Sequence, residues 1–236
     1  MALADTPGLD LPPLVFWVRP PEGVDPFEHA RAVAADRGAG ALVWSDDPVV
    51  LRLAVVLQPE SPLREARRAF FVGLAALGDA LAAACAPERR VLFDWPGTIL
   101  YDAARLGGAR LSWAPCAENE VPDWLVFGAE LIASRPGLTE PGAAPESTSL
   151  IEEAFDPAPR IVESFARYLM LYADHWTHAG FGPVAESVLK RMPDAGRDAR
   201  IEQDGDLTAP GRPRRPLLPA LTACAWRDPE AGGPRI

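Results

Sequence analysis

Lysine is almost absent from this chain of 236 residues. Of the 23 basic residues only Lys190 is a lysine, and all the others are arginines. A mechanism that needs a side-chain amine therefore has one candidate. Cysteine is also scarce, since the chain has Cys85, Cys116 and Cys224 and no others. Their wide spacing fits neither a CxxC metal pair nor a disulfide framework, which favours a reducing compartment.

Long apolar runs and a surplus of positive charge are missing as well. The longest apolar stretch, residues 69–86, is interrupted by Asp79 and is too weak for a membrane span. The N-terminus lacks the basic segment and the apolar core of a signal peptide. The formal net charge of -10 disfavours phosphate backbones and anionic membranes as partners. We therefore expect a cytoplasmic protein with no nucleic-acid partner and no membrane partner.

The composition is that of a globular protein, with 48% apolar residues. Its segments follow the order β-α-β-β-α-β-β-β-α, which predicts an α+β fold with a mixed, mainly antiparallel sheet backed by helices. Strands are expected over residues 14–18, 41–44, 51–57, 91–95, 106–113 and 124–132. Helices are expected over residues 26–37, 61–84 and 184–191, with another one after residue 157. From residue 193 the chain is rich in proline and arginine, which predicts a small C-terminal β-rich appendage (193–236) beside a main domain (1–192).

Residues 93–111 predict a hairpin with a bare floor. The Trp-Pro-Gly turn at 95–97 gives the first strand a sharp exit, because proline restricts φ and glycine admits unusual backbone conformations. At the start of the second strand, Gly107 and Gly108 leave no side chain between the backbone and a neighbour. Such a floor suits a flat ligand. The same glycines are also compatible with an ordinary hairpin in which they serve only turn geometry.

Four segments of the chain, in this order and spacing, resemble motifs of one enzyme family. They are DWPGTI at 94–99, RLGG at 105–108, DWLVFGAEL at 123–131 and WTHAGFGP at 176–183. They are similar to the KWPND, KLAG-like, WVVIGIGIN and W-x-x-x-G-F-x-P motifs of the catalytic domain of biotin–protein ligases. The chain is thus identified as a divergent member of the biotin/lipoate protein ligase family, over roughly residues 14–192. ARIEQDGDL at 200–207 is similar to the start of the small C-terminal barrel of that family.

The resemblance implies a fold of the class II synthetase type and a ligand that carries a carboxylate, either biotin or lipoate. In the family this acid is activated with ATP, with its associated Mg, and passed to a lysine of a biotinyl- or lipoyl-carrier domain. The resemblance implies no other metal. It implies a catalytic role for Arg105, which stands where the family has a lysine. The cofactor-binding residues that it implies are Trp95, Pro96, Gly97, Thr98, Gly107, Gly108 and Gly128.

The sequence departs from the family at the positions that handle the activated acid. The Gly- and Arg-rich adenylate loop of the family belongs between the strands at 41–44 and 51–57, where only residues 45–50 remain. Arg105 keeps a cation and can bind a carboxylate through two hydrogen bonds, but it is not a compact ammonium. Asp94 replaces a lysine and Thr98 replaces an acid of the same motif. The adenylate-binding loop and the catalytic lysine are therefore predicted to be missing.

Two hypotheses remain open from the sequence. The first is a ligase or acyltransferase that attaches a biotinyl, lipoyl or related acyl group to a carrier lysine, either with ATP or from a donor that is already activated. The second is a non-catalytic module, a pseudoenzyme that binds the cofactor or the carrier. Other candidate groups give weaker evidence of a functional site. Cys116 lies near the hairpin without a histidine or lysine partner. His175 and His178 have the spacing of a metal pair but no third ligand.

Overall fold

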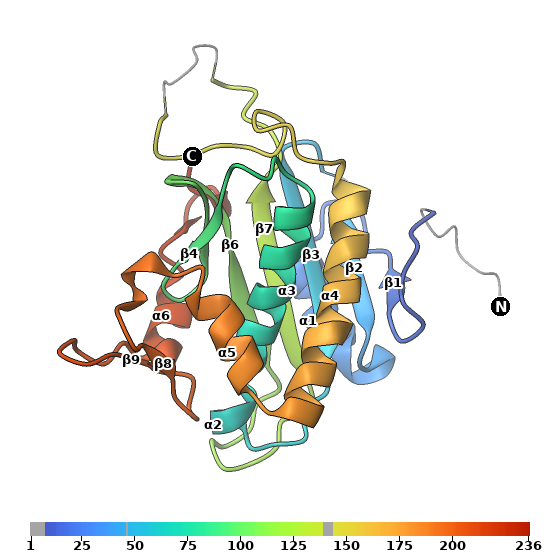
Figure 1. The fold of residues 1–236 in the computed structure, drawn as a ribbon. Coiled ribbons are helices and arrows are strands. Elements are labelled where there is room, and N and C mark those ends of the chain that lie inside the picture. Colours follow the sequence, from blue (N-terminus) through green and yellow to red (C-terminus); the bar gives the residue numbers. More distant parts are fainter. Residues whose placement is uncertain (1–7, 46, 139–143) are drawn as a thin grey trace.

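The computed structural model describes residues 8–45, 47–138 and 144–236. Within these residues seven strands form one sheet in the order β1-β2-β3-β7-β6-β5-β4 (Figure 1). The strands are β1 (Phe16–Val18), β2 (Ala41–Ser45), β3 (Val50–Leu57), β4 (Val91–Asp94), β5 (Thr98–Tyr101), β6 (Ala104–Trp113) and β7 (Leu125–Ile132). Only the β1–β2 pair is parallel, and every other pair of neighbours in this sheet is antiparallel. The predicted mixed, mainly antiparallel sheet is confirmed.

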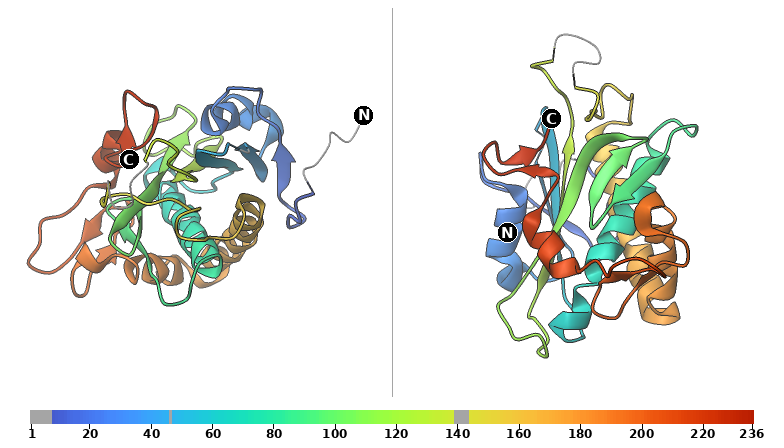
Figure 2. Two further views of the ribbon diagram at one scale, coloured as in Figure 1. Left: turned by 90° about the horizontal axis from the view of Figure 1, so that it is seen from above. Right: turned by 90° about the vertical axis from the view of Figure 1, so that its left-hand side faces the viewer.

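Helices cover the two faces of this sheet unequally. The larger layer contains α3 (Ala69–Ala83) and α4 (Ala158–Ala179), which pack against each other and against the sheet, with α5 (Gly182–Leu189) beside them (Figures 1 and 2). The opposite face carries α1 (Pro26–Arg37), which buries Phe27, Ala30 and Ala34 against β2, β3 and β7. We call these faces the α3 face and the α1 face. No helix among residues 8–45, 47–138 and 144–236 is long and apolar enough to cross a membrane.

The central strands are buried because they have neighbours on both edges and cover on both faces. All eight residues of β7 are buried, and β3 is nearly as buried, as its continuous apolar run predicts. The first helix also begins as predicted. Asp25 is its N-cap, accepts a hydrogen bond from the Phe27 N–H and precedes Pro26 in the first turn.

The hairpin predicted over 93–111 is wrong in one respect, because the segment contains a third strand. β5 lies between β4 and β6 and pairs with both, so the chain runs as a three-stranded meander. The turn-like composition of 96–98 concealed this short strand, which has four residues.

The single helix predicted over 61–84 is wrong as well, because the segment forms two helices, α2 (Leu63–Ala66) and α3. The longest helix of the described residues is α4.

The C-terminal residues contain short strand pairs, as expected, and a helix that was not predicted. They comprise the 3-10 turn η1 (Pro193–Ala195), the pair β8 (Arg200–Ile201) and β9 (Leu207–Thr208), α6 (Leu217–Ala223), and the pair β10 (Arg227–Asp228) and β11 (Gly233–Pro234). The right-hand view of Figure 2 shows the last residues on the same side of the sheet as α1. β11 lies against β6 and β7 there.

Candidate functional site

The two glycines of the predicted floor lie in β6, beside the central strand β7. Gly107 pairs with Leu131 and Gly108 pairs with Glu130. A Cβ atom on Gly107 would overlap the backbone carbonyl of Glu130, so this glycine allows β6 and β7 to approach closely. A Cβ atom on Gly108 would instead overlap the indole ring of Trp226. Gly108 thus leaves bare backbone on one face of β6, which we call the floor, and the chain's own C-terminal residues cover it.

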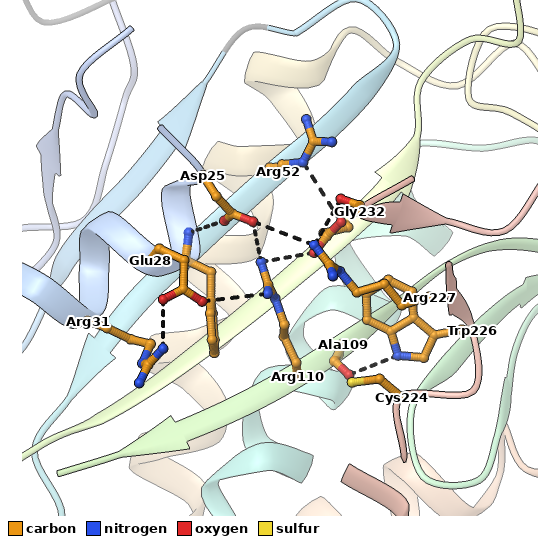
Figure 3. Close-up of polar contacts among 12 residues, drawn as sticks. Asp25, Glu28, Arg31, Arg52, Ala109, Arg110, Cys224, Trp226, Arg227 and Gly232 are labelled. Atoms are coloured by element: carbon orange, nitrogen blue, oxygen red, sulfur yellow. Dashed lines mark hydrogen bonds and ion pairs between the residues drawn. The ribbon is translucent and has the colours of Figure 1, made fainter. Parts of the chain in front are cut away.

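Trp226 lies flat against the floor and is 2% exposed. Its ring is in contact with the position where a side chain of residue 108 would be, and its Nε1 donates a hydrogen bond of 3.3 Å to the Ala109 carbonyl (Figure 3). Buried tryptophans usually satisfy their single N–H in this way. The indole is therefore fixed both by its packing and by a polar contact with β6.

A cluster of charged side chains lies next to Trp226 on the α1 face, which we call the α1-face cluster. Its members are Asp25, Glu28, Arg52, Arg110, Glu130 and Arg227 (Figure 3). Arg110 is at its centre. One of its terminal nitrogens lies 2.7 Å from Asp25 Oδ2 and 2.9 Å from Glu130 Oε1. The guanidinium carbon also lies 4.1 Å from the centre of the Phe27 ring, so Arg110 joins β6 to α1.

Glu130 is the buried acid of this cluster, with 1% exposure. Its Oε1 accepts a hydrogen bond of 3.1 Å from Arg227 Nε, while its Oε2 has no hydrogen-bond partner among the described residues. Arg52 Nε lies 3.8 Å from Oε2. A buried carboxylate oxygen without a partner costs free energy, so Glu130 holds acceptor capacity that a donor group could use.

The Asp25 carboxyl has an altered pKa. Burial by itself would raise this pKa, but the charge of Arg110 and the hydrogen bonds from Arg110 and the Phe27 N–H outweigh it. The pKa is held below the ordinary value of 3.8. Asp25 is therefore ionised at neutral pH and serves both as the N-cap of α1 and as the partner of Arg110.

The predicted catalytic Arg105 lies in β6 at the rim of the covered floor. Its backbone N–H donates to the Glu146 carbonyl, and its carbonyl accepts from the Thr148 N–H. Its side chain donates a hydrogen bond of 3.1 Å to the backbone carbonyl of Arg235. The guanidinium thus contacts the same C-terminal segment that places Trp226 on the floor.

The predicted cofactor-binding residues are divided between the two faces of the sheet. Trp95 packs on the Phe71 ring at 5.8 Å between centres, and a Cβ on Gly97 would overlap the Phe70 ring, so both face α3. Buried Pro96 lies between them. Thr98 pairs with Gly108, and a Cβ on Gly128 would overlap the Phe27 ring of α1. The α1 face therefore holds Thr98, Gly108 and Gly128.

The sequence interpretation missed the α1-face cluster. One signal was available, because Arg110 and Glu130 are charged residues in strands that otherwise read as apolar. A charged residue in a buried strand usually has a partner. The partners themselves could not be found in this way, because Asp25 and Arg227 come from segments far away in the sequence.

A cavity of about 860 Å³ opens beside the cluster. Its walls are residues 19–26, the facing ends of β2 and β3, and Gly232, and it shares Asp25 and Arg52 with the cluster. Residues 46–49 are all that connect β2 to β3. Asp47 and Pro48 of this connection also line the cavity.

The other candidate groups lie outside this site. Burial and the nearby carboxylates of Glu120 and Asp123 raise the pKa of the Cys116 thiol, which lowers its thiolate content. His178 Nδ1 lies 3.1 Å from Asp174 Oδ1. The part of the chain that the structure describes contains no group of three or more potential metal ligands. Lys190 forms an exposed pair with Glu186 on α5.

Comparison with known proteins assigns the chain to a family. The sequence model of the biotin/lipoate A/B protein ligase family matches residues 11–190. The chain belongs to this family. A biotin–[acetyl-CoA-carboxylase] ligase from Paracoccus denitrificans is 28% identical over 173 residues, which cover 71% of this chain and 70% of that protein.

Solved structures of the biotin/lipoate ligase family share the fold. A biotin protein ligase-like protein of unknown function from a Silicibacter species has a TM-score of 0.77 and 27% identity, with 90% of this chain and 98% of that chain covered. A variant biotin protein ligase from Aquifex aeolicus in complex with biotin has a TM-score of 0.61 and 12% identity, with 86% and 95% covered. The family resemblance drawn from the four motifs is confirmed, and so is the expected fold.

Proposed function

We propose that this protein binds a biotin-type or lipoate-type acyl compound on the α1 face of its sheet and attaches the acyl group to a lysine of a carrier domain. The observation that carries the proposal is the glycine floor of β6 in a chain of this family, with Arg105 at its rim. A flat ligand suits a backbone surface without side chains. The α1-face cluster supplies donors and acceptors beside that surface.

The chemistry of the transfer is an amide-forming substitution. The carrier lysine would attack the acyl carbonyl carbon, the bond to the leaving group would break with its electron pair, and the proton of the amine would pass to solvent. Arg105 is the residue of this chain that would hold a carboxylate or phosphate of the donor, through paired hydrogen bonds. Lys190 is unsuited to this role, because it forms an exposed pair with Glu186 on the far side of the molecule.

The residues present do not fit ATP-dependent activation well. Residues 46–49 are too few to form a glycine- and arginine-rich loop around an acyl phosphate. Such a loop would stabilise the negative charge that develops there. A donor that arrives already activated, such as an acyl adenylate, avoids the activation step and is the form of the reaction that the geometry favours.

The test is transfer to a carrier. The protein is incubated with a biotinyl- or lipoyl-carrier domain and either ATP with each acid or each preformed acyl adenylate, and the mass of the carrier is measured. We expect a mass gain with a preformed adenylate and little or none with ATP. Absence of any gain, under conditions in which an active ligase modifies the same carrier, would overturn the proposal.

Arg105→Ala tests the residue assignment in the same assay. If Arg105 anchors the donor, this variant loses transfer by about two orders of magnitude, which corresponds to roughly 2.7 kcal/mol. Arg89→Ala is the matched control, since it removes an exposed arginine that pairs with Asp102 in the turn between β5 and β6. An Arg105→Ala variant as active as Arg89→Ala would remove Arg105 from the mechanism.

A second candidate function is a non-catalytic module that binds an acyl compound or an acylated carrier. The observation that favours it is the cover over the floor together with the short β2–β3 connection. Calorimetric titration with biotin, lipoate, their adenylates and a lipoylated carrier tests it. Binding without transfer would support this second candidate.

A further inference from the structure

The C-terminal segment 224–235 contacts the same groups that an acyl ligand would use. Trp226 fills the space over Gly108, Arg227 donates to Glu130, and the Arg235 carbonyl accepts from Arg105. These contacts involve a floor glycine, the buried acid and the rim arginine of the site. All three contacts therefore lie at or beside the floor.

The groups of the segment also have the chemistry of a ligand. The indole of Trp226 is a flat, fused pair of rings, and its N–H points at the Ala109 carbonyl. The Arg227 side chain adds an N–H donor directed at Glu130 Oε1. The floor and its neighbours therefore present acceptors, so a matching ligand carries a fused ring system with N–H donors. Biotin has such a bicyclic ring with ureido N–H groups, whereas the single ring of lipoate has no N–H.

The rest of the C-terminal region has anchors of its own. Helix α6 is anchored by Leu217 and Leu221, which are buried in the main core. The segment begins directly after α6, at Cys224, which caps the helix in a left-handed conformation with φ of 41°. A left-handed residue at this position ends the helix, so the segment is not a continuation of α6.

We infer that residues 224–235 occupy the acyl-ligand site when no ligand is bound, with Trp226 in the place of the ligand ring. The ligand is a fused-ring, biotin-type acyl compound that must displace this segment. The inference rests on the proposed function and adds the ligand class and a means of regulation. A carrier domain or other partner that draws the segment away would raise the affinity for the ligand.

Fluorine NMR of the full chain labelled with 5-fluorotryptophan tests the displacement directly. The chain has seven tryptophans, and the Trp226 resonance is assigned by its loss in Trp226→Phe. On addition of biotin or biotinyl adenylate we expect this resonance to shift and to become sensitive to D₂O as the indole enters solvent. The resonance of Trp176, on the α3 face, should not move.

Affinity measured by calorimetry gives the second readout. If the segment covers the site in about 90% of molecules or more, removing its anchor should tighten binding by roughly tenfold or more. Trp226→Ala and Arg227→Ala each remove one contact that holds the segment. Arg227→Ala leaves the Trp226 ring in place, so it serves as the test if Trp226→Ala fails to fold. The matched controls are Trp176→Ala, on the α3 face, and Arg214→Ala, whose side chain pairs with Asp204 and Asp206.

The outcomes separate the inference from the proposed function. Equal affinity in the wild type and both variants, with a stationary Trp226 resonance, would overturn the inference while ligand binding stands. Failure of every acyl compound to bind the wild type and both folded variants would overturn the inference and the proposed function together. Lipoate binding more tightly than biotin in the variants would overturn the assigned ligand class.

Discussion

Gly107 and Gly108 are neighbours in the chain but are glycines for different reasons. Gly107 allows the β7 backbone to approach, since a side chain there would overlap the Glu130 carbonyl. Gly108 makes room for a side chain of the C-terminal segment, since its Cβ would overlap the Trp226 ring. A backbone in a central strand cannot move, whereas a docked ring can. The two positions should therefore respond differently to the same substitution.

Gly107→Ala should destabilise the protein more than Gly108→Ala. For Gly108→Ala the clash is relieved if Trp226 detaches, so the loss should stay within about 1–3 kcal/mol. For Gly107→Ala the strands must separate, so the loss should exceed that range. Urea unfolding gives both free energies, and acrylamide quenching reports exposure of Trp226. Gly182→Ala is the control, because a Cβ there meets nothing within 4 Å. Equal losses at 107 and 108 would contradict this account.

At the scale of elements, one acid joins three helices. Asp79 interrupts the apolar sequence of α3, and its two carboxylate oxygens accept from different helices. Tyr172 Oη of α4 donates to Oδ2, and Arg191, just after α5, donates to Oδ1, both at 2.6 Å. Burial, followed by the hydrogen bond to Asp79, raises the pKa of Tyr172, so this hydroxyl remains a donor at neutral pH.

Asp79→Ala should lower the free energy of unfolding by about 2–3 kcal/mol, because it removes two hydrogen bonds to a charged acceptor and leaves Arg191 without its partner. Equilibrium unfolding in urea measures the loss. Glu186→Ala provides the comparison, since the Glu186–Lys190 pair is exposed and its removal should have no measurable effect. If the two substitutions had the same effect, Asp79 would not be the junction of these helices.

At the scale of the whole molecule, the acidic composition makes stability depend on pH through particular pairs. The pKa of Asp25 is held down by Arg110 against the opposing effect of burial, and that of Glu152 is held down first by its hydrogen bond to Arg135. These carboxyls have lower pKa values in the folded chain than in the unfolded chain. The stability that they contribute is complete above the ordinary carboxyl pKa and is lost as pH falls through the folded pKa.

The free energy of unfolding should therefore fall as pH is lowered below about 4.5, where unfolded carboxyls begin to bind protons. Asp25→Asn should make this fall less steep. Asparagine still caps α1, so the variant changes the ion pair rather than the helix end. Urea unfolding between pH 7 and pH 3 measures the slope, with Glu22→Gln in the loop before α1 as the control. An unchanged slope in Asp25→Asn would show that the Asp25–Arg110 pair does not contribute.

The sequence by itself determined the fold class and the order of most elements of the main sheet. The apolar runs at 51–57 and 124–132 predict buried central strands, and Asp25-Pro26 predicts the start of α1, because these signals are local. The four-residue strand β5 was not predicted, because a strand of this length is too short for its pattern to stand out from the neighbouring turn. The break between α2 and α3 was not predicted from the sequence, because helix boundaries depend on packing as well as on propensity.

Only the tertiary structure decided what covers the predicted floor. Gly108 and Trp226 are 118 positions apart, and Asp25 meets Arg110 across 85 positions, so no local pattern could bring them together. Docking of the C-terminal segment depends on shape and on charge partners that only the folded sheet provides. The sequence predicted a backbone floor at the glycine pair. The folded chain decided that Trp226 lies on it, because burying a large aromatic ring there removes apolar surface from water and satisfies its N–H.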